Sequence, residues 1–137
     1  MQLKRDTDYA LRILCCCVKE TNPRGISLKR LCQEAVVPRT IAARLCRALT
    51  KEDILTENIW NNHFFYAFNR KASDKSLYDI IRIIEGSAGL FEVFDHSTQF
   101  YGNCENSLKL IDEWFTNGLK GIRIQNFTEK CAATDEN

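Results

Sequence analysis

The sequence lacks several features that would mark a membrane protein or a secreted protein. No apolar run approaches the ~20 residues that a membrane-spanning helix requires. The N-terminus, MQLKRDTDYA, carries acidic residues where a signal peptide would have its apolar region. We therefore expect a cytoplasmic protein that does not contact a membrane.

Cysteine is plentiful, but its spacing matches neither a metal site nor a disulfide framework. The seven cysteines are odd in number and form no CxxC pair. Cys15, Cys16 and Cys17 are consecutive, so on a helix their side chains point about 100° apart and cannot converge on one metal ion. For most of them, and for Cys32, packing as small apolar side chains is the expected role.

Charge is nearly balanced over the whole chain but not along it. The formal net charge is +1. Residues 1–50 hold 10 Lys/Arg against 4 Asp/Glu, whereas residues 51–137 hold 9 against 14. This asymmetry could arise by chance, but it suggests that a polyanion docks at the N-terminal end of the molecule.

The stretch PRTIAARLCRAL, residues 38–49, makes that suggestion specific. Wound as an α-helix, it places one set of side chains on an arc of about 140° with no carboxylate among them. Apolar residues fill the other side, which predicts a packed inner face and a basic outer face. The residues of the outer face are Arg39, Thr40, Ala43, Arg44 and Arg47.

Apolar periodicity and capping residues predict the order of the other elements. The stretches ILTENIW and HFFYAF are rich in β-branched and aromatic residues and are joined through Asn61 and Asn62, which predicts a β-hairpin. Three helices and a hairpin in this order predict a winged helix-turn-helix over residues 1–70. The predicted helices cover about residues 6–20, 28–35, 38–50, 76–85 and 107 onward, with a loop at 87–106 and a frayed tail from 129.

Several segments follow one another in a characteristic order along almost the whole chain. They are YALRIL, SLKRLCQEA, a turn, the basic helix and a wing followed by SLYDIIRIIEG. In this the chain resembles the Rrf-two family of bacterial transcription regulators. That family includes the iron–sulfur cluster regulator, the nitric-oxide-sensing repressor and the cysteine-metabolism repressor. The resemblance implies a mainly α fold with a small β-hairpin, in which residues 71–137 supply a linker helix, a sensor-like loop, a long C-terminal dimerisation helix and a tail.

The resemblance also implies a homodimer that reads a palindromic operator in double-stranded DNA. The helix in the second half of the chain would cross onto the partner subunit, while the third helix of each subunit enters the major groove. The residues expected at the dimer contact are Leu108, Ile111, Trp114, Phe115 and Leu119.

The sequence departs from the family pattern in three places. The wing, ENIWNNHFF, has neither the glycines nor the arginine that family wings usually carry. Ala43 and Arg44 stand where many members place a base-contacting glutamate or glutamine, so a different operator is expected. Cluster-binding members have three cysteines before the dimerisation helix, whereas here only Cys104 fits, with Glu92 and Thr98 at the other places.

Chemistry supports specific DNA contacts from three segments. Arginines of the third helix can hold phosphates or pair with guanine, and Thr40 can bond a phosphate or touch a thymine methyl group. Ser27 and Lys29 open the second helix, where a phosphate could sit. Asn61 and Asn62, with His63 beside them, could touch phosphate or sugar from the wing.

Cys104 is the candidate sensor, because YGNCENS is polar and reads as a loop with an accessible thiol. Asp8 falls where one branch of the family takes an extra cluster ligand, and His96 could add a nitrogen. These ligands are too few for an ordinary iron–sulfur centre, so no cofactor or metal is predicted. Thiol modification, a small ligand, a partner enzyme and a degenerate cluster remain alternative signals.

An enzyme would need a nucleophile beside a base together with an oxyanion or phosphate loop. Cys104 and His96 are close in sequence but have no such loop, so catalysis is not expected. The sequence predicts a homodimeric transcription regulator, a repressor of the Rrf-two type. The alternative is a winged-helix protein-interaction module that has lost DNA reading, with the aromatic wing as its contact.

Overall fold

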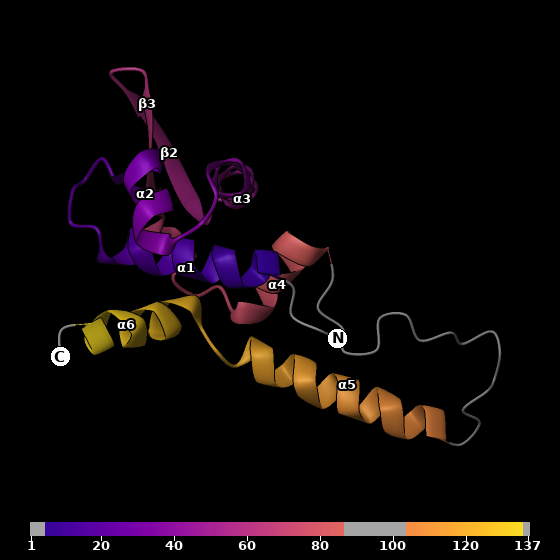
Figure 1. The fold of residues 1–137 in the computed structure, drawn as a ribbon. Helices are drawn as coiled ribbons and strands as arrows, with labels where there is room; N and C mark the ends of the chain where they lie inside the picture. The colour runs from indigo at the N-terminus through magenta and orange to yellow at the C-terminus, as the bar shows by residue number, and fades with distance from the viewer. Residues whose placement is uncertain (1–4, 87–103, 136–137) are drawn as a thin grey trace.

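The computed structural model describes residues 5–86 and 104–135, and it is mainly helical (Figure 1). Glu92, His96 and Thr98 lie outside these residues. In the described part, no helix is long and apolar enough to cross a membrane. The elements follow the order α1 (Arg5–Lys19), β1 (Ile26–Ser27), α2 (Leu28–Ala35), α3 (Arg39–Lys51), β2 (Leu55–Trp60), β3 (His63–Phe68), a 3-10 turn (Arg70–Ala72), α4 (Leu77–Glu85), α5 (Cys104–Lys120) and α6 (Ile124–Asp135).

One apolar core holds the winged part together, and α1 lies at its centre. This helix packs against α2, α3, α4 and α6. Its inner face is apolar, and Ala10, Ile13, Leu14 and Cys17 are all buried there. Thr7 is also buried, and its hydroxyl donates a 2.8 Å hydrogen bond to Glu85.

The turn between α2 and α3 fixes the helix-turn-helix angle. Ser27 caps α2 as predicted, its hydroxyl accepting the N–H of Arg30. Val36 ends α2 in the left-handed region, with φ 55° and ψ 57°, while its side chain is 71% exposed. A β-branched residue is unfavourable in this conformation, so the turn is locally strained. Val37 then turns inward and is buried.

The predicted hairpin is confirmed, and it forms part of a small antiparallel sheet of order β1-β3-β2. Trp60 lies opposite His63, and the turn residues Asn61 and Asn62 have φ 50° and 63°. Two successive positive φ values are typical of the type I′ turn that suits the twist of a hairpin. The third strand, β1, was not predicted, because it has only two residues.

Two corrections concern the C-terminal half. The helix that was expected from about Ser107 begins at Cys104, so this cysteine opens α5 instead of lying in the predicted loop. The segment expected to fray from about Glu129 is helical, because α6 runs to Asp135. Buried Ile124 anchors α6, and its N–H bonds the carbonyl of Lys75 at 2.8 Å.

Candidate nucleic-acid interface

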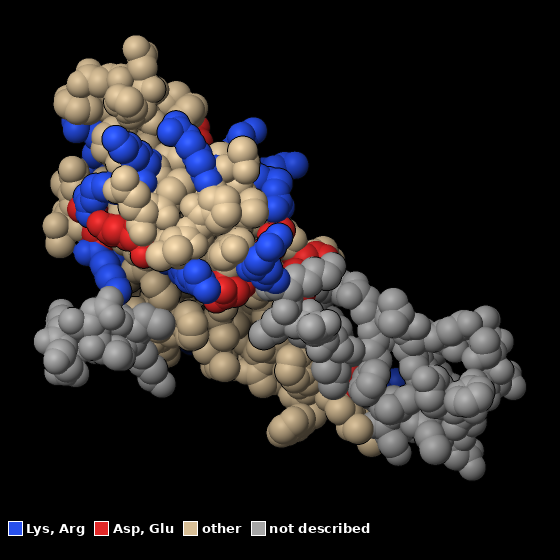
Figure 2. Space-filling model, in the orientation of Figure 1, with Lys and Arg blue, Asp and Glu red and all other residues tan. Residues whose placement is uncertain are grey.

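The two faces of α3 are divided as the sequence predicted. Ala42, Leu45, Cys46 and Leu49 are buried against the core. The outer residues Arg39, Thr40, Arg44 and Arg47 are exposed, and Ala43 is half-buried between them. Figure 2 shows Lys and Arg side chains gathered over α2 and α3, with most carboxylates along the lower border of this region. The arrangement gives α3 a positive outer face beside the wing.

One of the four outer residues is already engaged. A terminal nitrogen of Arg44 lies 2.8 Å from the Asp6 carboxylate, in the first turn of α1. The helix itself carries no carboxylate on this face, but Asp6, which is 38 residues earlier in the sequence, lies against it. Sequence reasoning missed Asp6, because nothing local connects it to α3. By contrast, no ion pair engages Arg39 or Arg47 within residues 5–86 and 104–135.

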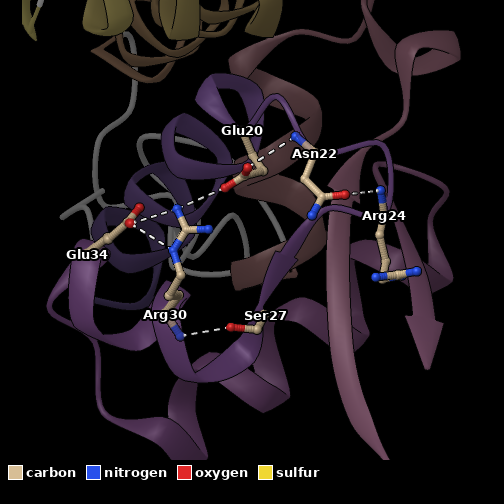
Figure 3. Close-up of polar contacts among 6 residues, drawn as sticks. All are labelled: Glu20, Asn22, Arg24, Ser27, Arg30 and Glu34. Carbon is tan, nitrogen blue, oxygen red and sulfur yellow. Dashed lines mark hydrogen bonds and ion pairs between the residues drawn. The ribbon is translucent and has the colours of Figure 1, made fainter. Parts of the chain in front are cut away.

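The start of α2 places a second group of charges next to this face. Lys29 is exposed, whereas Arg30 is held between two carboxylates (Figure 3). A terminal nitrogen of Arg30 lies 2.9 Å from both Glu20 and Glu34. These carboxylates raise the pKa of Arg30, and their negative charges offset its positive charge. Of the two cations, Lys29 is therefore the one available for a phosphate.

The end of the wing is uncharged and unusually apolar. Ile59, Trp60 and Phe64 are 65%, 49% and 42% exposed. Asn61 and Asn62 are also exposed, at the turn between the strands. Nearer the helices the hairpin is buried at Tyr66 and Phe68, so about half of the aromatic residues pack inward, as the alternation of strand side chains predicts.

The two buried cysteines of the helical core are neutral thiols. Cys17 and Cys46 are buried, and Cys15, Cys16 and Cys32 are half-buried. Burial raises the pKa of Cys17 and raises that of Cys46 to about 12. Since the thiolate is the reactive form, these two thiols are poor nucleophiles and poor metal ligands at neutral pH. Their role is the packing that the sequence predicted.

The residues suggested for a cluster do not come together as a donor set in the described part of the chain. No group of three or more His, Cys, Asp or Glu side chains there is arranged to hold a metal ion. The carboxylate of Asp8 lies 2.7 Å from Arg12 and is committed to that ion pair. His96 lies outside the described residues, and the structure describes only the backbone position of Cys104. The described residues therefore do not supply three protein ligands to a cluster.

The helix α5 carries an apolar face that no other part of the described chain covers. Leu110, Ile111 and Trp114 are 65%, 45% and 78% exposed. Phe115 and Leu119 are half-buried beside them, whereas the side chain of Leu108 lies outside the described residues. Monomeric proteins rarely leave such a patch open to water, so this face is suited to a partner.

Solved structures with this arrangement come from several bacteria. CymR (YrzC), the global cysteine regulator of B. subtilis, aligns with a TM-score of 0.76 at 17% identity, covering 95% of this chain and 98% of that chain. The oxidized form of Staphylococcus aureus CymR aligns at 0.71 and 18% identity, covering 94% and 97%. The chain has the fold of these proteins.

Another structure, T. potens IscR, aligns at 0.71 and 17% identity, covering 96% of this chain and 88% of that chain. No protein-family model and no curated protein sequence matches the chain. The fold expected from the resemblance to the Rrf-two family, a winged helix-turn-helix followed by a long helix, is thereby confirmed.

Proposed function

We propose that the chain is a homodimeric, sequence-specific DNA-binding transcription regulator that acts as a repressor. The observation that carries the proposal is the outer face of α3. Arg39, Thr40 and Arg47 are exposed on a helix of the unit that reads DNA in winged helices, and the two arginines have no carboxylate partner among the described residues. The fold shared with CymR and IscR supports the same assignment.

The proposed contacts fall into two groups, those that read the base sequence and those that position the protein on the DNA backbone. Arg39, Arg44 and Arg47 would hold phosphates or reach guanine in the major groove, with Thr40 near the start of the helix. Lys29, at the start of α2, would bind backbone phosphate beside it. Asn61 and Asn62 would contact sugar or phosphate from the wing.

The apolar face of α5 supports a dimer. Ile111 and Trp114 need cover from water, and a second copy of the same helix would supply it in a two-fold arrangement. Two copies of α3 related by such an axis would read a palindrome, because the symmetry of the operator mirrors that of the protein. DNA binding would place the protein in the cytoplasm, on the nucleoid.

The deciding experiment mixes purified protein with sheared DNA from its own source and sequences the fragments retained at near-physiological salt. The Arg44→Ala/Arg47→Ala variant should lose them. A matched control, Lys71→Ala/Lys75→Ala, removes two exposed cations outside the helix-turn-helix and should retain them. A recurring palindrome lost only in the first variant supports the proposal, whereas equal retention by all three proteins contradicts it.

The exposed Ile59, Trp60 and Phe64 favour one other function, a protein-interaction module. Salt separates the two. DNA affinity falls steeply as salt rises because neutralised phosphates release counterions, whereas an apolar contact between proteins does not weaken in this way.

A further inference from the structure

The wing contains no arginine or lysine between Leu55 and Phe68, yet the fold places one on it. Arg24 comes from the loop before β1. Its guanidinium lies 3.9 Å from the centre of the Trp60 ring and 5.8 Å from that of Phe65. Figure 3 shows its side chain extending beside the hairpin, away from the network of Glu20, Arg30 and Glu34. The cation therefore belongs spatially to the wing.

Hydrogen bonds fix the backbone of Arg24 at both its N–H and its carbonyl group. Its N–H donates to the Asn22 side chain at 2.9 Å, and its carbonyl accepts from the Asn58 side chain at 3.1 Å. Gly25 follows with φ 102°, where an added Cβ would lie 2.3 Å from the carbonyl oxygen of Tyr66. Only glycine allows so close an approach. The wing and the Arg24 loop are thus a single rigid unit.

The guanidinium is held but not neutralised. A cation–π contact with the indole engages the π-system of the guanidinium and does not use its N–H donors, which lie around the edge of the group. No carboxylate pairs with Arg24 in the described residues, unlike Arg30 and Arg44. A planar, preorganised set of unpaired donors fits a phosphate group.

Arg24 lies at the end of the wing. Trp60 is the last residue of β2, directly before the turn at the end of the wing. The side chains of Trp60 and Asn58 lie on the face of the hairpin opposite to buried Tyr66, so Arg24 lies on the outer face of the wing.

We propose that Arg24, held by Trp60, is the wing's phosphate contact, binding the backbone of duplex DNA beside the minor groove. The inference rests on the proposed function and adds to it a residue outside the helix-turn-helix and the wing. It also accounts for a wing that lacks its own arginine. Because the contact is to backbone, its contribution should be independent of sequence.

The test uses the full-length protein and a fluorescein-labelled DNA duplex of random sequence, with affinity measured by anisotropy between about 50 and 200 mM salt. Arg24→Ala should weaken binding roughly three- to tenfold and flatten the plot of log affinity against log salt by about 0.9 per bound subunit. Trp60→Leu retains the charge but removes its platform, so it should lose part of the affinity. Arg70→Ala is the matched control, since Arg70 lies over Phe68 at the other end of the same hairpin.

Thermal unfolding of each variant checks that the fold is retained, and Arg47→Ala reports the α3 contact independently. If Arg47→Ala weakens binding while Arg24→Ala behaves like Arg70→Ala, the inference is wrong and the proposed function stands. If the wild-type protein shows no salt-sensitive binding, the proposed function fails and the inference fails with it. A loss in Arg24→Ala that exceeds the loss in Arg70→Ala, with the smaller salt slope, supports it.

Discussion

Replacing Asp6 with asparagine is expected to strengthen DNA binding. In the free protein, the Asp6 carboxylate lies 2.8 Å from a terminal nitrogen of Arg44. A DNA phosphate that binds Arg44 must compete with this carboxylate. The side chains of Arg44 and Asp6 are 58% and 30% exposed, and ion pairs with such exposure contribute about 0.2–1 kcal/mol. Asp6→Asn should therefore raise the affinity about 1.5- to 5-fold at low salt.

The same change should slightly destabilise the fold. Asp6 lies in the first turn of α1, where a negative charge interacts favourably with the helix dipole. Losing this interaction and the ion pair should lower the free energy of unfolding by up to about 1 kcal/mol, measured by urea titration. A stronger DNA complex from a less stable protein is an unusual combination, and it identifies the carboxylate as a competitor for the arginine.

Asp8→Asn is the matched control, because it removes an equal charge from the same turn but frees Arg12 instead of Arg44. Anisotropy with the retained operator measures both variants, together with the double variant Asp6→Asn/Arg44→Ala. The double variant should bind as weakly as Arg44→Ala alone. Equal gains from Asp6→Asn and Asp8→Asn would refute the reasoning, since net charge alone would then explain the effect.

Three further predictions follow from other parts of the fold. Val36→Gly should raise the free energy of unfolding by about 1 kcal/mol, because glycine adopts the left-handed conformation without strain; a lower melting temperature would contradict this. Between pH 9 and about 12, Cys46 is ionised in the unfolded chain but still protonated in the fold. Its contribution to the free energy of unfolding is therefore complete below pH 9 and declines as the pH rises through this range. Cys46→Ala should therefore flatten the alkaline loss of stability by up to about 1.4 kcal/mol per pH unit, and urea titrations giving the same slope for both proteins would argue against it. Trp114→Glu should shift the protein from dimer to monomer in analytical ultracentrifugation, because it places a charge on the apolar face of α5; an unchanged sedimentation coefficient would exclude this face as the dimer contact.

Local patterns in the sequence were sufficient to predict the winged helix-turn-helix. The division of α3 into buried and exposed faces follows directly from the helical period. The helix expected over 76–85 is present as α4, although Ser76 caps it through a capping box with Asp79 instead of forming its first turn. Asn61 and Asn62 marked the turn of the hairpin, because asparagine tolerates positive φ.

The features that sequence reasoning missed are contacts between distant segments. Asp6 with Arg44 and Arg24 with Trp60 each join segments more than thirty residues apart, and neither pair has a spacing that could indicate it. The sequence predicted one helix from about residue 107 onward, but not that a second helix, α6, follows it. That helix depends on tertiary contacts, since Ile124 is buried in the core of the winged part. Composition alone indicated a frayed polar tail.

The central place of α1 has a consequence for how such a chain can evolve. Its Thr7 hydroxyl bonds a residue 78 positions away, and Ile80 and Ile124 complete the core around it. The winged part and the helices that follow it therefore share one interior. Replacing the residues after 70 with the corresponding segment of another protein would remove Glu85, the acceptor of Thr7, together with the core residues Ile80 and Ile124. Substitutions on the two sides of this interior are therefore coupled through packing.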